Sequence, residues 1–134
     1  MSVIKSKRKL SSVEFINTAM DLEIFTIKQC LKFPKRYTFV INNTLIDLAK
    51  ECLINVKMAN NIIPSNKQEY EARRLYLLTA KGNIINLYTQ LDIARELFDI
   101  KENTFKGWID LAIKEENLIN GILKKDNERY KNLI

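Results

Sequence analysis

The chain has 134 residues, 46% of them apolar, with only three glycines and two prolines. The apolar content argues for one ordered domain with its own core, and the scarcity of turn residues argues against an all-β fold. The net charge of +6 favours an anionic partner, although a lysine-rich surface also serves solubility alone.

The chain starts with a basic arm, followed by an amphipathic helix. Residues 1–10 contain no acid and four cations, which are Lys5, Lys7, Arg8 and Lys9. This arm either frays or contacts nucleic acid. Ser11 and Glu14 predict a capping box that opens a helix ending by Phe33, because a residue before proline avoids the helical region. Its predicted inward stripe is Val13, Ile16, Met20, Ile24, Ile27 and Leu31, with Phe15, Ala19, Leu22 and Phe25 beside it.

A basic connection then leads to the second predicted helix. Residues 32–37 hold three cations and two aromatics within six positions. The second helix is expected from about Thr38 to Ile62, and Pro64 separates it from the third. Its predicted inner face is Ile41, Leu45, Leu48, Ala49, Cys52, Val56, Ala59 and Ile63.

The third predicted helix, over about residues 67–98, is the one around which the others pack. Its seam has the alternating three- and four-residue steps of a helix packed on other helices: Leu77, Ala80, Ile84, Leu87, Leu91, Ala94 and Phe98. A second apolar set lies off this seam, which predicts a second contact within the chain or with another copy: Leu75, Leu78, Ile85, Ile93 and Leu97. Gly82, in mid-helix, is expected at a close helix crossing.

The fourth helix is expected from near Asn103 to Lys125. Its predicted inward residues are Phe105, Trp108, Ile109, Ala112, Ile119 and Leu123. Glu116 falls within this stripe, which predicts partial exposure or a polar partner there. Taken together, the elements predict an all-α, antiparallel up-down four-helix bundle over residues 11–125, with a basic arm at 1–10 and a fraying tail at 126–134.

Many kinds of active site are excluded because the chain contains no histidine. Histidine acid–base catalysis, histidine-dependent triads, the usual zinc sites and the Glu-x-x-His motif of ferritin-like bundles all need that residue. Gly82, Gly107 and Gly121 are too far apart for a phosphate-binding loop, and adjacent Glu115 and Glu116 point to different sides of a helix. We therefore predict that the chain is not an enzyme and holds no metal or cofactor.

The sequence also indicates a compartment. No apolar run reaches the ~20 residues of a membrane-spanning helix, and no apolar signal core follows the basic start. We therefore expect a cytoplasmic protein without a membrane partner. Cys30 and Cys52 fall on apolar sides of predicted helices, where a reduced thiol packs as a small hydrophobe.

The candidate nucleic-acid surface consists of the arm and two basic clusters. The first cluster, in the basic connection, places its cations beside Phe33 and Tyr37, and the second, on the third helix, beside Tyr70 and Tyr88. The candidate contacts are Lys5, Lys7, Arg8, Lys9, Lys32, Lys35, Arg36, Arg73, Arg74 and Lys81. Cations would bind phosphates and aromatics would stack on bases, mostly without sequence preference. Alternatively, the cations form a solvated face and the aromatics are edges of the core.

Four short motifs resemble a family of small bacterial proteins. They are Phe33-Pro34-Lys35 closing the first helix, Ala59-Asn60 ending the second, Arg73-Arg74-Leu75 entering the third and Gly121-Ile122-Leu123 in the fourth. The family is the four-helix-bundle family of the accessory variability determinant of diversity-generating retroelements. It also includes proteins encoded in intervening sequences of large-subunit ribosomal RNA. The resemblance covers about residues 10–125.

The resemblance implies a bundle that assembles into a homopentameric barrel with a basic surface and without catalysis of its own. In the retroelement branch it implies binding to a reverse transcriptase and its template RNA during mutagenic copying into cDNA. Members of that branch carry arginines partway along the third helix, where this chain has Asn86, Tyr88 and Gln90. Two functions stay open: a reverse-transcriptase accessory subunit that binds RNA or cDNA, and a structural oligomeric scaffold of the intervening-sequence type without nucleic-acid binding.

Overall fold

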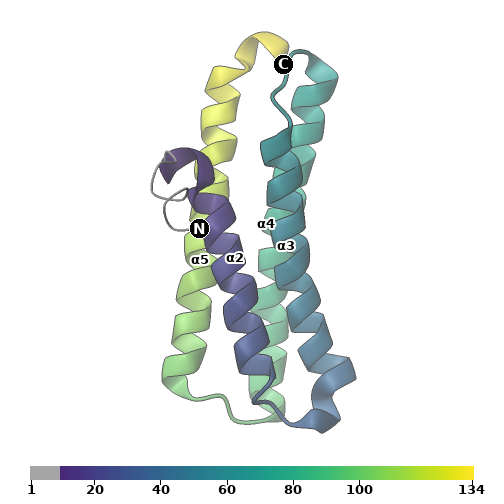
Figure 1. The fold of residues 1–134 in the computed structure, drawn as a ribbon, viewed down its shortest axis with the longest axis vertical. Coiled ribbons are helices and arrows are strands. Elements are labelled where there is room, and N and C mark those ends of the chain that lie inside the picture. Colours follow the sequence, from purple (N-terminus) through teal and green to yellow (C-terminus); the bar gives the residue numbers. More distant parts are fainter. Residues whose placement is uncertain (1–9) are drawn as a thin grey trace, which may run out of the picture.

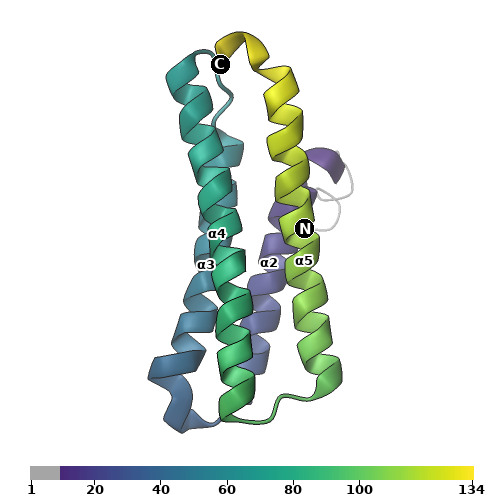
Figure 2. The same cartoon turned by 180° about the vertical axis from the view of Figure 1, so that it is seen from behind.

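The computed structural model describes residues 10–134 as a bundle of helices. This part of the chain contains four α-helices and no strand: α2 (Leu10–Cys30), α3 (Asn43–Asn61), α4 (Lys67–Leu97) and α5 (Glu102–Arg129). Successive helices run in opposite directions, so the joints alternate between the two ends of the molecule (Figures 1 and 2). The predicted four-helix bundle is confirmed. Within the same residues, no helix is long and apolar enough to cross a membrane.

The helix ends follow local polar contacts. The Asn66 side chain accepts a hydrogen bond from the Glu69 backbone N–H at 2.9 Å, which makes Asn66 the N-cap of α4. The Glu69 carboxylate in turn accepts the Ser65 backbone N–H at 2.8 Å, and this bond lowers the pKa of Glu69. Between α2 and α3, a 3-10 turn at Lys35–Tyr37 and a π-helical turn at Thr38–Asn42 precede the helix. The capping box predicted at Ser11 does not open the first helix, because α2 already begins at Leu10.

The seam predicted on α4 forms the centre of the core. Six of its seven residues are buried, and only Phe98, just past the helix end, is half-buried: Leu77, Ala80, Ile84, Leu87, Leu91 and Ala94 make up the buried set. The two cysteines are buried and free, as expected, and burial raises the pKa of the Cys30 thiol to about 12.

The stripe predicted for α2 is not the buried face of this helix: Met20, Ile24 and Leu31 are exposed. Three residues placed beside that stripe are buried instead, and the full buried set is Phe15, Thr18, Ala19, Leu22, Thr26 and Cys30. Threonine is tolerated inside because its hydroxyl finds partners: Thr26 donates to the Leu22 carbonyl at 2.7 Å and accepts the indole N–H of Trp108 at 3.1 Å. Two polar residues therefore mark the core side of this helix.

Two further expectations are corrected. Residues 126–134 do not form a separate tail, because α5 continues to Arg129, Asp126 is buried, and the Tyr130 ring lies 5.9 Å from that of Tyr70. Gly82 does not lie at a close crossing within the described chain, because a Cβ added there would meet no atom within 4 Å.

Candidate nucleic-acid interface

The cations of the first cluster are accessible. Lys32, Lys35 and Arg36 are all exposed and lie in the connection between α2 and α3, at the lower end of the bundle in Figure 1. Among residues 10–134 the only ion pair joins Arg73 and Asp126, so no acid in this part of the chain neutralises these three charges at short range. They can therefore reach phosphate groups.

The aromatics of the same cluster are not accessible for stacking on bases. The Phe33 ring packs against Phe98 and Trp108, with centroids 4.7 and 5.8 Å apart. Tyr37 stacks on Phe98 at 5.0 Å and donates its hydroxyl hydrogen to the Leu97 carbonyl at 3.4 Å. Both rings close the end of the core. They hold the backbone that carries the cations, and the Arg36 guanidinium also lies over the Tyr37 ring, 5.2 Å from its centroid.

An exposed aromatic that sequence reasoning missed lies next to these cations. Phe39 is 85% exposed, and its neighbour Val40 is exposed as well. Both belong to the π-helical turn at Thr38–Asn42. Such turns are rare and frequently mark functional sites. Phe39 lies two residues past the cluster at 32–37 that the sequence singled out. Lys32, Lys35, Arg36 and Phe39 are called the basic joint below.

Arg73, predicted to bind nucleic acid, is instead a structural residue. It is 9% exposed, and its Nε and Nη2 donate to the two carboxylate oxygens of Asp126 at 2.6 and 3.2 Å. Its Nη1 donates to the carbonyls of Ala59 and Ile62 at 3.0 and 3.2 Å. Four hydrogen bonds hold the guanidinium group inside the bundle, which removes Arg73 from the candidate surface.

The rest of the second cluster is only partly available. Tyr70 is buried and donates its hydroxyl hydrogen to the Asn127 side-chain oxygen at 2.9 Å. Tyr88 donates to the Glu116 carboxylate at 2.8 Å, and burial together with this bond raises the pKa of Tyr88. Arg74 and Lys81 remain half-buried on one side of α4. The structure therefore does not assemble this cluster as a base-stacking surface.

Of the adjacent acids Glu115 and Glu116, Glu115 is the one buried inside the bundle. Glu115 is 0% exposed, neither of its carboxylate oxygens has a hydrogen-bond partner among the described residues, and burial raises its pKa to about 9. Its charge also contributes to the raised pKa of Cys52 on α3, after burial of that thiol. Glu116 is half-buried and paired with Tyr88, as its position in the predicted stripe suggested.

Four of the candidate contacts, Lys5, Lys7, Arg8 and Lys9, lie outside the described residues. In residues 10–134 no group of three cysteine, aspartate or glutamate side chains is placed to hold a metal ion. Comparisons of the chain with models of protein families, with curated proteins and with solved structures find no match.

Proposed function

We propose that this chain is a non-catalytic accessory subunit of a reverse transcriptase, which binds template RNA or its cDNA as a homo-oligomer. The basic joint is the observation that carries the nucleic-acid part of this proposal. It combines three exposed cations with an exposed phenylalanine on a backbone fixed by Phe33 and Tyr37. Cations of this kind bind phosphates, and an exposed ring stacks on a base of any sequence. The reverse transcriptase as partner, in a diversity-generating or related retroelement, comes from the family resemblance.

An exposed apolar stripe on α4 supports assembly with further copies of the chain. It consists of Leu75, Leu78, Gly82, Ile85 and Ile93 and is called the α4 stripe below; its four large side chains are exposed. From Leu75 to Ile85 the steps are three, four and three residues, which is the spacing of a helix packed on another helix, and Ile93 follows eight residues later. The open space at Gly82 would let a second helix approach closely. A homopentamer is the assembly that the resemblance implies.

RNA binding by the oligomer tests the nucleic-acid part. In electrophoretic mobility shifts with a structured RNA, the affinity of the full chain should fall steeply with salt concentration. Reversal of the joint charges with Lys32→Glu, Lys35→Glu and Arg36→Glu should weaken binding and lower the salt slope by about 2, from about 0.7 per lost phosphate contact. A matched control reverses three exposed lysines elsewhere: Lys50→Glu, Lys57→Glu and Lys106→Glu. Equal loss in the two triple variants would contradict the basic joint as the site.

A scaffold without nucleic-acid binding is the second candidate function. The observation that favours it is internal use of the second cluster, since Arg73, Tyr70 and Tyr88 all have partners within the bundle. This function predicts a co-purified protein partner that nuclease treatment does not release. Absence of RNA binding at low salt by an intact oligomer would favour the scaffold over the accessory subunit.

A further inference from the structure

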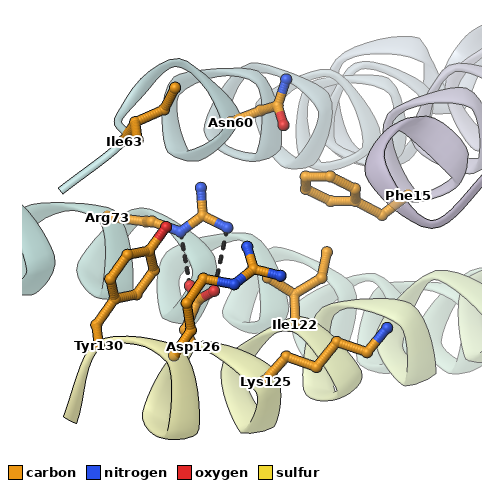
Figure 3. A pocket seen from close by; sticks show the side chains of 9 residues that line it. Phe15, Asn60, Ile63, Arg73, Ile122, Lys125, Asp126 and Tyr130 are labelled. Carbon is orange, nitrogen blue, oxygen red and sulfur yellow. Dashed lines mark hydrogen bonds and ion pairs between the residues drawn. The ribbon is translucent and has the colours of Figure 1, made fainter. Parts of the chain in front are cut away.

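A pocket of about 450 Å³ lies at the end of the bundle opposite the basic joint. All four helices contribute to it, with Phe15 from α2, Asn60 from α3, Arg73 from α4 and Asp126 from α5 (Figure 3). Its volume falls in the range of small-molecule sites, roughly 300–1,000 Å³. The sequence did not predict this pocket. The last turn of α5 forms one of its walls, and that turn lies in residues 126–134, which were expected to fray.

The charge of the pocket is positive at its rim and balanced at its base. Arg73 and Asp126 are both buried and neutralise each other. Lys125 and Arg129 also line the pocket, are exposed, and form no ion pair with any residue from 10 to 134. They stand one helical turn apart, where like charges repel each other. The rim therefore carries two positive charges that an anionic group can neutralise.

Apart from the polar Asn60, the rest of the lining is apolar or aromatic and consists of Phe15, Ile63, Ile122 and Tyr130. The Tyr130 ring lies 5.9 Å from the ring of Tyr70, and the Arg129 guanidinium lies 5.9 Å from the Tyr130 ring. A flat apolar ring and an anion can therefore be bound side by side in one pocket, by stacking and by charge-assisted hydrogen bonds respectively.

From this combination we infer that the pocket binds a nucleotide through its phosphate. The phosphate lies at Lys125 and Arg129, and the base lies against Tyr130 and Ile122. A free nucleotide and the phosphorylated end of a nucleic-acid strand present the same chemistry to this site. The inference goes beyond the proposed function, because the pocket and the basic joint are at opposite ends of the bundle (Figure 1) and neither needs the other.

Calorimetric titration of the full chain at low salt, with adenosine monophosphate as the probe, tests the site. Adenosine without the phosphate should bind at least about tenfold more weakly, a difference of about 1.4 kcal/mol. The double variant Lys125→Ala, Arg129→Ala should lose a similar factor. The control Lys114→Ala, Lys124→Ala removes two exposed charges from the same helix outside the pocket lining and should bind like the parent. Thermal unfolding of each variant verifies its fold.

Oligonucleotides with and without a 5′ phosphate distinguish the two sources. Weaker strand binding without the 5′ phosphate, seen in the parent but not in Lys125→Ala, Arg129→Ala, assigns the pocket to strand ends. Mononucleotide binding without such a dependence assigns it to free nucleotides. No binding of mononucleotide or phosphorylated strand at millimolar concentration would overturn the inference, as would equal binding of adenosine or equal loss in the control. These outcomes leave the proposed function unaffected, since RNA binding through the basic joint is measured with different variants.

Discussion

Arg73 and Asp126 tie the first turns of α4 to the last turns of α5 through two hydrogen bonds, from Nε to Oδ2 at 2.6 Å and from Nη2 to Oδ1 at 3.2 Å. The same guanidinium reaches the carbonyls of Ala59 and Ile62 at the end of α3. One side chain therefore holds three helices together at one end of the bundle. Both side chains are nearly inaccessible to water, so removal of either one leaves the other charge buried without its countercharge.

The first prediction is a large loss of stability when this pair is broken. Asp126→Ala should lower the free energy of unfolding by about 3–5 kcal/mol, because it leaves the Arg73 charge buried and uncompensated. Urea unfolding followed by circular dichroism measures the change. Glu128→Ala removes an exposed acid two residues away and should change the free energy by less than about 0.5 kcal/mol. An equal loss of free energy of unfolding in Asp126→Ala and Glu128→Ala would contradict a stabilising role for the Arg73–Asp126 pair.

The second prediction concerns pH and Glu115. Its folded pKa of about 9 lies above the ordinary value of 4.5, so the folded protein keeps a proton that the unfolded chain releases between these values. The free energy of unfolding should therefore fall as the pH rises from about 5 to 9, by up to about 1.4 kcal/mol per pH unit. The groups Cys30, Cys52 and Tyr88 also have raised pKa values, but their ordinary values of 9.0, 9.0 and 10.0 place their effects above this window.

Unfolding in urea at pH 5, 7 and 9 measures this slope. Glu115→Leu should stabilise the protein and flatten the slope, since leucine removes the buried group that lacks a hydrogen-bond partner. Glu128→Gln removes an exposed acid from the same helix and should keep the slope of the parent. If the free energy of unfolding of Glu115→Leu keeps the pH slope of the parent, groups other than Glu115 cause the pH dependence.

The part of the fold that can be predicted from sequence is the part where apolar spacing has one solution. On α4 a single three-and-four seam is continuous, and it is the buried one. On α2 two apolar stripes compete, and the buried one contains Thr18 and Thr26. The Trp108 indole that pairs with Thr26 lies 82 residues further along the chain, so no local pattern could select the correct side.

The candidate site shows the same limit. Arg73 and Arg74 are adjacent and chemically identical in the sequence, but about 100° of helical rotation separates them. Arg73 pairs inside the bundle with a carboxylate 53 residues further along the chain, whereas Arg74 is half-buried at the surface. Phe39 was missed for a different reason, because it lies two residues beyond the basic and aromatic cluster at 32–37.

The third prediction tests the core seam. Leu87 is 1% exposed, so Leu87→Asp places a carboxylate among apolar side chains and should destabilise the protein by more than about 4 kcal/mol or unfold it. Loss of the helical circular dichroism signal, or a strongly lowered melting temperature, measures this effect. Unchanged melting would contradict the seam.

The fourth prediction uses Ile85, two residues before Leu87 on the same helix, to separate assembly from folding. Ile85 is 47% exposed within the α4 stripe, so Ile85→Asp costs little in a single chain but places a charge in any interface built on that stripe. Light scattering coupled to size-exclusion chromatography should give an oligomer for the parent and a mass near 15.7 kDa for the variant, with helical content retained. Asn86→Asp, at the neighbouring exposed position, adds the same charge outside the stripe and should leave the oligomer intact. A parent that is monomeric at micromolar concentration would remove the α4 stripe as an interface between copies, and an oligomer that survives Ile85→Asp would move the interface to another face of the bundle.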